Sequence, residues 1–529
     1  MTTGYPVWGW ARNADDAPTP ASLRDLVPLV REHLGLPVTD PETPADLPTL
    51  PPDRVSARLP RTLLGIANDD PFDRARHSLG RSYRDVVRGI RGQLDHVVDL
   101  VLRPRSEDDV VAALDWCADA RVAVIPYGGG TSVVGGVEPV VSNDWTGVVS
   151  LDLGWFRGVA ELDPVSRAAR VRAGTPGPQL EDELKAHGLT ARFFPQSFER
   201  STVGGWIVTR AAGHFSSRLT HIDDLVESVR AVTPTGVWES RRLPGSGAGP
   251  SPDRLLLGSE GTLGVVTEAW LRVQPRPTHR WAATAAAPNF PAGAAAVRAL
   301  MHAGLLPATC RLIDGREAAA TGTLDTGEAA LVLGFESYGA PVDADAELAL
   351  TVCADHDLRV LESGPRGGSG TAWRSSFMRA PYVREQLVLL GLIVETFETA
   401  VTWDRFDDLV TSVRTAGEEA LARVCGSGTI TCRLTHVYPD GAAPYFTVMA
   451  PGRHSSELAQ WDDIKSAVSD AILAAGGTIT HHHAVGRDHM RWYDVQRPDA
   501  FAAAYRGAKS AVDPVGILNP GVLVNTQGE

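Results

Sequence analysis

Several features are missing from the sequence, and each absence excludes a class of protein. The five cysteines are odd in number and scattered, with no Cys-x-x-Cys pair, so we expect reduced and mostly buried thiols. No stretch approaches the ~20 uninterrupted apolar residues that a membrane-spanning helix needs. Residues 1–30 lack the basic start and apolar run of a signal peptide. We therefore expect a cytoplasmic protein.

The sequence also has fewer basic residues than acidic ones. The chain has 50 Lys and Arg against 64 Asp and Glu, which gives a net charge of −14. That balance disfavours general attraction to nucleic acid or to an anionic membrane. An anionic ligand must therefore be held by particular, locally placed arginines or lysines.

The length of the chain and the changes in its local composition predict several domains. At 529 residues the chain exceeds the ~250–300 residues at which single cores stop growing. Proline and acidic residues crowd positions 37–60, and Ala-rich helical patterns replace short strands after Thr278. We expect an N-terminal helical region and linker over 1–92, a domain over 93–275, a second domain over 276–450 and a helical segment over 451–529.

Local patterns place two groups of elements. A β-rich run at 97–102, a capping-box spacing that begins at Ser106 and a buried strand at 122–125 predict a strand–helix–strand unit. Towards the other end, the pattern predicts a helix at 464–475, then a glycine turn and a short β segment. The first unit leads directly into a glycine-rich loop.

This loop is the first motif with chemical content, and it reads Pro126-Tyr127-Gly128-Gly129-Gly130-Thr131-Ser132. Consecutive glycines let backbone N–H groups converge on an anion with no Cβ in the way. A Walker loop would need Gly-Lys-Ser/Thr, and a Rossmann loop would need glycine in place of Val133, so both fail. A pyrophosphate cradle and a plain tight turn remain as alternatives.

A second motif combines hydroxyls with glycines. It runs from Pro195 to Trp206 and continues to Gly213. Hydroxyl groups beside glycines can bond polar atoms of a flat ligand while the backbone lies close to it. Alone, the motif is equally compatible with a polar turn before a helix.

A third motif runs from Gly258 to Glu268. Its β-rich end predicts a strand entered by a glycine turn, which is a common structural pattern and decides little by itself.

In this order and spacing, the three motifs resemble the FAD-binding half of the vanillyl-alcohol-oxidase superfamily. The resemblance implies an α+β fold: a PCMH-type FAD-binding domain at 93–275, an α+β cap domain at 276–450, and helical termini, the last of which returns to the flavin. Because the glycine loop contains no His or Cys, we expect non-covalent FAD. The implied cofactor-binding residues are Pro126, Gly128, Gly129, Gly130, Thr131, Ser132, Gln196, Ser197, Ser201, Thr202, Gly204, Thr209, Ala211, Glu260, Gly261, Thr262, Gly264, Val265 and Val266.

Three consecutive histidines, His481, His482 and His483, follow the second glycine turn. Histidine is the side chain most easily tuned to move protons near neutrality. In an extended segment His481 and His483 would face one way and His482 the other. A metal site is the less favoured alternative, because the ligands are adjacent and no His-Glu-x-x-His spacing is present, so we expect no metal.

The histidine run resembles the motif of the alkyldihydroxyacetonephosphate synthase family. Further resemblance covers nearly the whole chain and lies at Trp8-Gly9-Trp10, 77–81, 311–314, 397–399, 432–435 and Tyr445-Phe446. By motif, Tyr445 and His481, His482 and His483 match that family's catalytic residues. Arg384 matches its substrate-contacting arginine, and Arg311 matches a further functionally sensitive one.

The resemblance implies a redox-neutral transferase of ether-lipid synthesis. Acyl-dihydroxyacetone phosphate and a fatty alcohol would give alkyl-dihydroxyacetone phosphate and a fatty acid, through an adduct of substrate C1 with flavin N5. Such a cycle needs a base for a C1 proton and a cation for the phosphate. The partner is then a lipid-like or anionic small molecule and not a nucleic acid, and we expect a homodimer with a peripheral membrane contact where the substrate is a lipid.

Two alternatives remain open. FAD-dependent oxidoreductases of 2-hydroxy acids or alcohols share the glycine motifs, but their His-x-Gly-Asp-Gly-Asn-x-His stretch corresponds here to the segment after His436, which lacks the asparagine and the second histidine. A non-enzymatic flavin scaffold is the other, and the cluster of polar residues disfavours it. Ala484, Gln196 and Phe193-Phe194 depart from the synthase pattern, and each could signal a changed substrate.

Overall fold

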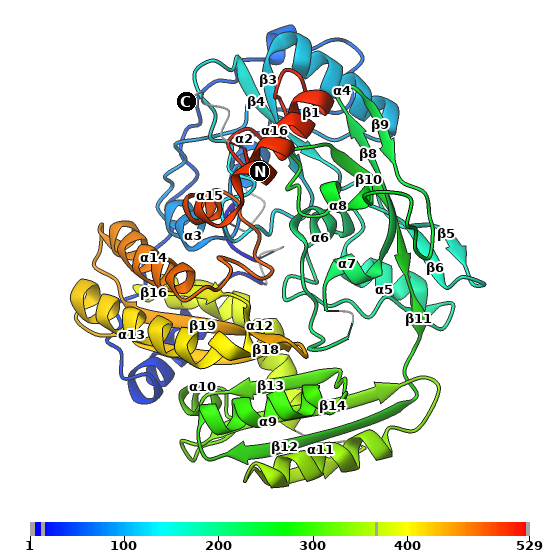
Figure 1. Cartoon of the computed structure of the whole chain (residues 1–529). Helices are drawn as coiled ribbons and strands as arrows, with labels where there is room; N and C mark the ends of the chain where they lie inside the picture. The colour runs from blue at the N-terminus through cyan, green and yellow to red at the C-terminus, as the bar shows by residue number, and fades with distance from the viewer. Residues whose placement is uncertain (1–5, 12–15, 219, 366–368, 525–529) are drawn as a thin grey trace.

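The structure is a computed structural model that describes residues 6–11, 16–218, 220–365 and 369–524. Two smaller sheets occupy the upper half of Figure 1, and one large sheet occupies the lower half. Two hydrophobic cores correspond to the two halves, and the N-terminal helices add to the lower core while the C-terminal segment adds to the upper one. The architecture therefore mixes helices and sheets, as the sequence predicts.

The first sheet sets the position of the glycine loop. Its strands lie in the order β1 (Ala67–Asn68), β2 (Leu100–Leu102), β4 (Gly147–Asp152) and β3 (Val122–Tyr127), and β2, β4 and β3 are parallel. Helix α4 (Glu107–Ala120) crosses from β2 to β3 and begins at Ser106 with the predicted capping box to Asp109. Because β3 ends at Tyr127, the glycine loop leaves the sheet at its carboxyl edge.

The second sheet is antiparallel and supports the other two motifs. Its order is β5 (Val159–Asp163), β6 (Ala168–Arg172), β10 (Val265–Arg272), β8 (Val226–Thr233) and β9 (Gly236–Glu239). Around it lie α5 (Gly177–Lys185), α6 (Val203–Thr209), α7 (Ile222–Leu225), α8 (Asp253–Leu256) and the pair β7 (Leu189–Thr190) and β11 (Gln274–Pro275). The second motif leads into α6, and the third leads into β10.

The large sheet has eight strands. Its order is β15 (Arg359–Gly364), β12 (His279–Ala287), β14 (Ala329–Ser337), β13 (Thr309–Ile313), β18 (Thr429–Val437), β19 (Gly441–Pro451) and β16 (Leu392–Glu398), with β17 (Val401–Thr402) paired to β19. Its helices are α9 (Phe290–His302), α10 (Gly315–Ala320), α11 (Asp343–Asp355), α12 (Ser369–Leu389), η4 (Trp403–Arg405), α13 (Phe406–Cys425) and α14 (Glu457–Ala474). The strands β16, β18 and β19 carry polar side chains to the upper half.

The two ends of the chain pack against different halves of the molecule. The N-terminal part contains α1 (Pro20–Pro28), η2 (Leu29–His33), η3 (Ser56–Arg58), α2 (Pro71–Arg76) and α3 (Tyr83–Ile90), and the C-terminal part contains α15 (Met490–Gln496) and α16 (Asp499–Val512). After α16, the backbone N–H of Asn519 donates to the carbonyl of Val124 at 2.8 Å. The C-terminal segment thus pairs with β3, the strand that ends in the glycine loop.

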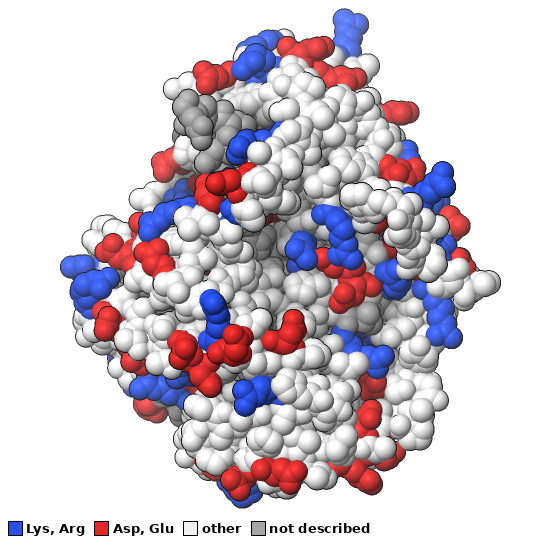
Figure 2. All heavy atoms as spheres, viewed as in Figure 1, with Lys and Arg blue, Asp and Glu red and all other residues white. Residues whose placement is uncertain are grey.

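Two sequence predictions are altered in detail. The strand expected at 97–102 is shorter, because only Leu100–Leu102 pairs with β4, and the helix expected at 464–475 begins earlier, at Glu457. The five cysteines are free, and all but Cys425 are buried, as predicted. Among the described residues, no helix is long and apolar enough to cross a membrane. On the face shown in Figure 2, acidic and basic side chains are interspersed.

Candidate active site

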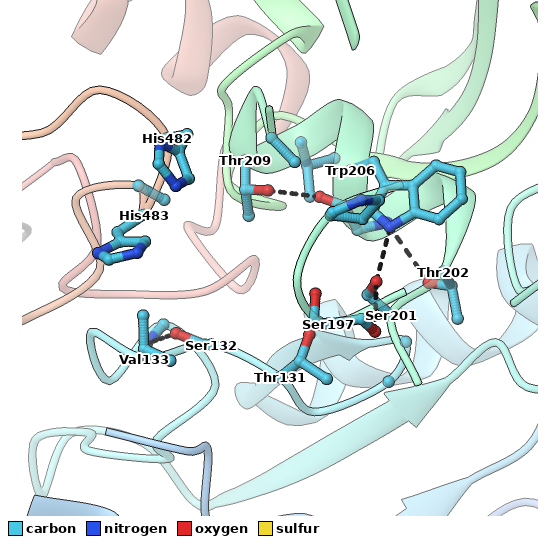
Figure 3. A pocket seen from close by; sticks show the side chains of 18 of the residues that line it. Thr131, Ser132, Val133, Ser197, Ser201, Thr202, Trp206, Thr209, His482 and His483 are labelled. Atoms are coloured by element: carbon cyan, nitrogen blue, oxygen red, sulfur yellow. Dashed lines mark hydrogen bonds between the residues drawn. The ribbon is translucent and has the colours of Figure 1, made fainter. Parts of the chain in front are cut away.

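A deep cavity lies where the two halves meet, with a volume of about 1570 Å³ that includes its opening to solvent. Figure 3 shows Ser201, Thr202 and Thr209 on one side and His482 and His483 on the other, with Thr131 and Ser132 of the glycine loop below them. The predicted residues that line it are Pro126, Gly128, Gly129, Gly130, Thr131, Ser132, Gln196, Ser197, Ser201, Thr202, Gly204, Thr209, Ala211, Glu260, Gly261, Gly264, Val266, Arg311, Tyr445, His482 and His483. The three motifs therefore form one wall, and the histidines face it.

Three glycines of this wall leave no room for a side chain. A Cβ on Gly129 would lie 2.1 Å from the carbonyl oxygen of Arg200, and one on Gly128 would lie 2.3 Å from Oγ1 of Thr202. A Cβ on Gly204 would lie 2.8 Å from Cβ of Ala173. The loop therefore packs against the second motif through bare backbone, which leaves a smooth, polar surface of the kind that accommodates a dinucleotide.

The second motif supplies this wall with hydroxyl groups. Thr202 caps the N-terminus of α6, and Oγ of Ser201 accepts a hydrogen bond from Nε1 of Trp206 at 2.7 Å (Figure 3). Oγ1 of Thr209 donates to the carbonyl of Gly205 at 2.8 Å. These bonds fix the side chains that border the cavity. The residues present thus fit FAD, because a backbone-lined cradle is joined to a row of oriented hydroxyls.

The third motif contributes Glu260, which links the cofactor wall to the histidine loop. Its carboxylate accepts hydrogen bonds from the N–H groups of Val485 and Gly486, each at 2.8 Å. Burial raises the pKa of Glu260 to about 7. Thr262 and Val265 lie behind the wall instead of lining it: Thr262 bonds the hydroxyl of Tyr505, and the Val265 side chain is in the core. No direct cofactor contact is assigned to either.

The prediction that His481 and His483 face the same side is wrong. His482 and His483 line the cavity, whereas His481 points away from it, towards Tyr438. The reason is that no strand forms here. The N–H groups of both His482 and His483 donate to the carboxylate of Glu398 at 2.8 Å, so the backbone turns and the two-residue period of a strand does not apply.

Glu398, at the end of β16, orients the cavity-facing imidazole. Its Oε2 lies 2.9 Å from Nδ1 of His482. Burial alone would raise the pKa of Glu398, but the nearby imidazoles of His482 and His483 outweigh it and hold that pKa well below its usual range. A carboxylate on Nδ1 fixes the tautomer in which Nε2 of His482 is free to accept a proton. Sequence reasoning missed this role, although Glu398 lies in the segment 397–399 that resembles the synthase family.

Tyr445, on β19, lies beside the histidine loop. Its ring is stacked with that of His482 at a centroid distance of 6.2 Å. The guanidinium of Arg433, on the neighbouring strand β18, lies 4.1 Å from the centroid of the tyrosine ring. Burial raises the pKa of Tyr445 despite that cation. Arg433 is in turn ion-paired with Glu317 at 2.6 Å. Tyr445 is therefore a neutral hydroxyl at neutral pH, and Arg433 is a second residue that sequence reasoning did not assign.

The two predicted substrate arginines differ in position. Arg311, on β13, lines the cavity and donates to the carbonyl oxygens of His214 and Thr435, and burial lowers its pKa to about 9. Arg384, on α12, lies outside the described cavity lining and donates through Nη2 to the carbonyl of Arg81, while its Nε has no partner among the described residues. Arg384 is nevertheless close enough to Tyr445 and His483 for its charge to lower the pKa of both.

A metal ion is not assigned to the histidine cluster. Possible ligand atoms of His436, His481 and His482 lie within 4.8 Å of one another. However, Nε2 of His436 lies 2.9 Å from the carbonyl oxygen of Gly213, and the other rings take part in further hydrogen bonds. We therefore treat the cluster as a hydrogen-bonded network.

Comparison with known proteins defines the class. Family models of the FAD binding domain and of the C-terminal domain of FAD linked oxidases match residues 98–240 and 276–523. The solved structure of p-cresol methylhydroxylase with substrate bound aligns with a TM-score of 0.69 over 89% of this chain and 96% of its own, at 14% identity, which shows a shared fold. The chain therefore contains an FAD binding domain and a C-terminal domain of FAD linked oxidases, in the fold of the PCMH or vanillyl-alcohol-oxidase type, and FAD is its cofactor.

Within that class the chain is similar to alkyldihydroxyacetonephosphate synthases. The synthase of Dictyostelium discoideum is 29% identical over 484 residues, which are 87% of this chain and 78% of the relative. A solved structure of an alkyldihydroxyacetonephosphate synthase aligns with a TM-score of 0.76 at 26% identity and covers 94% of this chain and 92% of its own. The resemblance inferred from the sequence motifs is confirmed.

Proposed function

We propose that the protein is an FAD-dependent alkyl transferase that converts acyl-dihydroxyacetone phosphate and a fatty alcohol into alkyl-dihydroxyacetone phosphate and a fatty acid. One observation carries the proposal beyond family likeness: a histidine oriented by a buried carboxylate, His482 with Glu398, faces the cofactor wall across the cavity. Hydride transfer from an alcohol needs a base only for the hydroxyl proton. A reaction that removes a proton from carbon and later returns one needs a base that holds it beside a neutral acid, and His482 with His483 and Tyr445 provides both.

The roles of the chain's own residues follow from their positions. Bound FAD would supply an electron-accepting ring system at the histidine side of the wall. His482 would take a proton from C1 of the substrate on Nε2, and Glu398 would stabilise the resulting imidazolium. Tyr445 and His483 would hydrogen-bond the groups that leave and enter at C1. Arg384, whose charge acts on Tyr445 and His483, would bind the substrate phosphate.

The flavin is proposed to be bound without a covalent link, since the glycine loop contributes neither His nor Cys. Precipitation of the purified yellow protein with acid should release all of the yellow colour into the supernatant. Yellow colour that stays with the protein pellet would contradict this part of the proposal, and mass spectrometry of the peptides would then identify the attached residue.

An exchange assay tests the reaction itself. The protein is incubated without oxygen with palmitoyl-dihydroxyacetone phosphate and a long-chain alcohol labelled with ¹⁸O. We expect free palmitate, an ether product that keeps the ¹⁸O, and no net loss of flavin absorbance, because the carboxylate leaves with its own oxygen. A wax ester would indicate attack at the carbonyl instead. Bleaching by a 2-hydroxy acid, with no exchange, would establish the oxidoreductase alternative.

The setting of the enzyme is also proposed. We infer a cytoplasmic homodimer that contacts membranes only peripherally, where its lipid substrates reside. The net charge of −14 opposes electrostatic attachment, so contact would depend on apolar side chains. Co-sedimentation with neutral vesicles that contain the acyl substrate, compared with vesicles that lack it, tests the contact, and light scattering gives the mass of the assembly.

A further inference from the structure

His481 connects the cavity histidine to a side chain outside the cavity wall. Its Nδ1 lies 3.0 Å from Nδ1 of His482, and its Nε2 lies 2.7 Å from the hydroxyl of Tyr438. His482 lines the main cavity, whereas the half-buried Tyr438 lines a separate surface depression with Arg405, Asp440, Thr478 and Gln496. A series of hydrogen-bonding groups therefore joins the cavity to Tyr438, a residue that lines a second opening.

We propose that His481 and Tyr438 carry protons between His482 and this surface depression. The relay rests on the proposed function, in which His482 takes a proton from C1 of the substrate. His482 gains that proton on Nε2 and passes its Nδ1 proton, which lies between Oε2 of Glu398 and Nδ1 of His481, to Nδ1 of His481. His481 then gives its Nε2 proton to the oxygen of Tyr438, whose own proton leaves to water. One proton enters and one leaves, and only N–H and O–H bonds change.

The surroundings of His481 and Tyr438 keep both side chains neutral, as a proton relay requires. Burial, with repulsion from His482 and His221, holds the pKa of His481 well below its usual range, and burial raises that of Tyr438. Both groups are therefore neutral at rest, and each can accept a proton only as it releases another. The charged or titratable groups that face this pair are Glu398, His221, His436, His482, His483, Asp224 and Asp440.

A second exit through His221 is less suitable. Nε2 of His221 lies 3.1 Å from Nε2 of His481, but its Nδ1 lies 3.3 Å from the carbonyl of Arg210. A carbonyl accepts a hydrogen bond but cannot take up a proton at neutral pH. A proton that reached His221 would thus have no onward path on that side, whereas the hydroxyl of Tyr438 both accepts and donates.

Deuterium content of the product tests the relay. In the proposed reaction C1 loses one hydrogen and regains one, so in D₂O the hydrogen that returns reports whether the base exchanged with solvent. The holoenzyme is run to completion with unlabelled substrates, and the ether product is analysed by NMR. We expect about one deuterium per C1 with the native protein, where fast relay precedes return of the proton. Tyr438→Phe keeps the ring but not the hydroxyl, and it should lower that content several-fold.

A control variant and a second relay variant separate loss of the relay from unrelated effects of substitution. Tyr338→Phe removes a hydroxyl from an exposed residue just after β14 and should leave the deuterium content unchanged. His481→Asn, with flavin absorbance as the check of folding, should reproduce the loss seen with Tyr438→Phe. Native product without deuterium, or unchanged deuterium in both relay variants, would overturn the relay. Loss with His221→Asn but not with Tyr438→Phe would show that the exit is wrongly assigned. Absence of any ether product from the native protein would instead remove the proposed function, and the relay with it.

Discussion

Glu260 and Glu398 bind opposite ends of the same histidine loop. Glu398 accepts the N–H groups of His482 and His483, and Glu260 accepts those of Val485 and Gly486. Glu260 belongs to the cofactor wall and Glu398 to the large sheet. The loop is therefore set by both halves at once, so that its position depends on their correct packing.

Glu260 should make stability fall with rising pH. Its pKa rises from 4.5 to about 7 on folding because burial disfavours the charge. Between these values the folded state binds the extra proton, so the free energy of unfolding should drop by about 3 kcal/mol from pH 4.5 to above pH 7. Glu260→Gln stays neutral and should lack this component. Urea unfolding of both proteins at pH 5 and pH 8 measures the difference, and equal slopes with pH would contradict it.

Glu398→Gln should leave FAD bound but lower kcat by about 10²-fold or more, since Gln cannot stabilise an imidazolium on His482. The depressed pKa of Glu398 affects stability in the opposite direction to the raised pKa of Glu260. The stabilisation by the Glu398 carboxylate is complete above pH 4.5 and is lost as the pH falls through the lower pKa of the folded state. The free energies of unfolding of the native and variant proteins should therefore converge in acid. Glu347→Gln, on the exposed face of α11, is the matched control. Native kcat in Glu398→Gln would remove this residue from the site.

The cofactor wall could be predicted from the sequence because its properties are local. A glycine has no Cβ wherever it occurs, and the loop that begins at Gly128 follows directly from the buried strand β3. The fold class and FAD followed from three such motifs in order, and the likeness to the synthases followed from the histidine run and shorter matches along the chain. The comparisons confirm all three.

The orientation of the histidines could not be predicted in this way. Glu398 lies 84 positions before His482, and Glu260 lies 225 positions before Val485, and no local pattern indicates that these pairs meet. The period of a strand gave the wrong facing for His481, because contacts with Glu398 and not strand pairing determine the path of the loop. Arg433 reaches Tyr445 as its cross-strand neighbour, which depends on the register of β18 with β19.

Gly129→Ala should abolish flavin binding. The added Cβ would lie 2.1 Å from the carbonyl of Arg200, so the glycine loop must move away from the second motif. Gly245→Ala adds the same atom where nothing lies within 4 Å and is the matched control. The ratio of absorbance at 450 nm to that at 280 nm in the purified proteins gives the flavin content. Equal ratios in the two variants would show that the contact at Gly129 is not limiting for the cofactor.

His482→Ala should retain the flavin and lose turnover. The side chain faces the cavity, while the glycine loop and the second motif that form the cofactor wall are separate segments, so its removal leaves that wall intact. Loss of a positioned general base costs about 10²–10⁴-fold in rate. The exchange assay gives kcat, and flavin absorbance gives occupancy, with His187→Ala as an exposed control. If an added imidazole restores part of the rate in His482→Ala but none in Glu398→Gln, the missing group is the base itself. Native turnover in His482→Ala would assign proton removal to another side chain, and His483 would be the next to test.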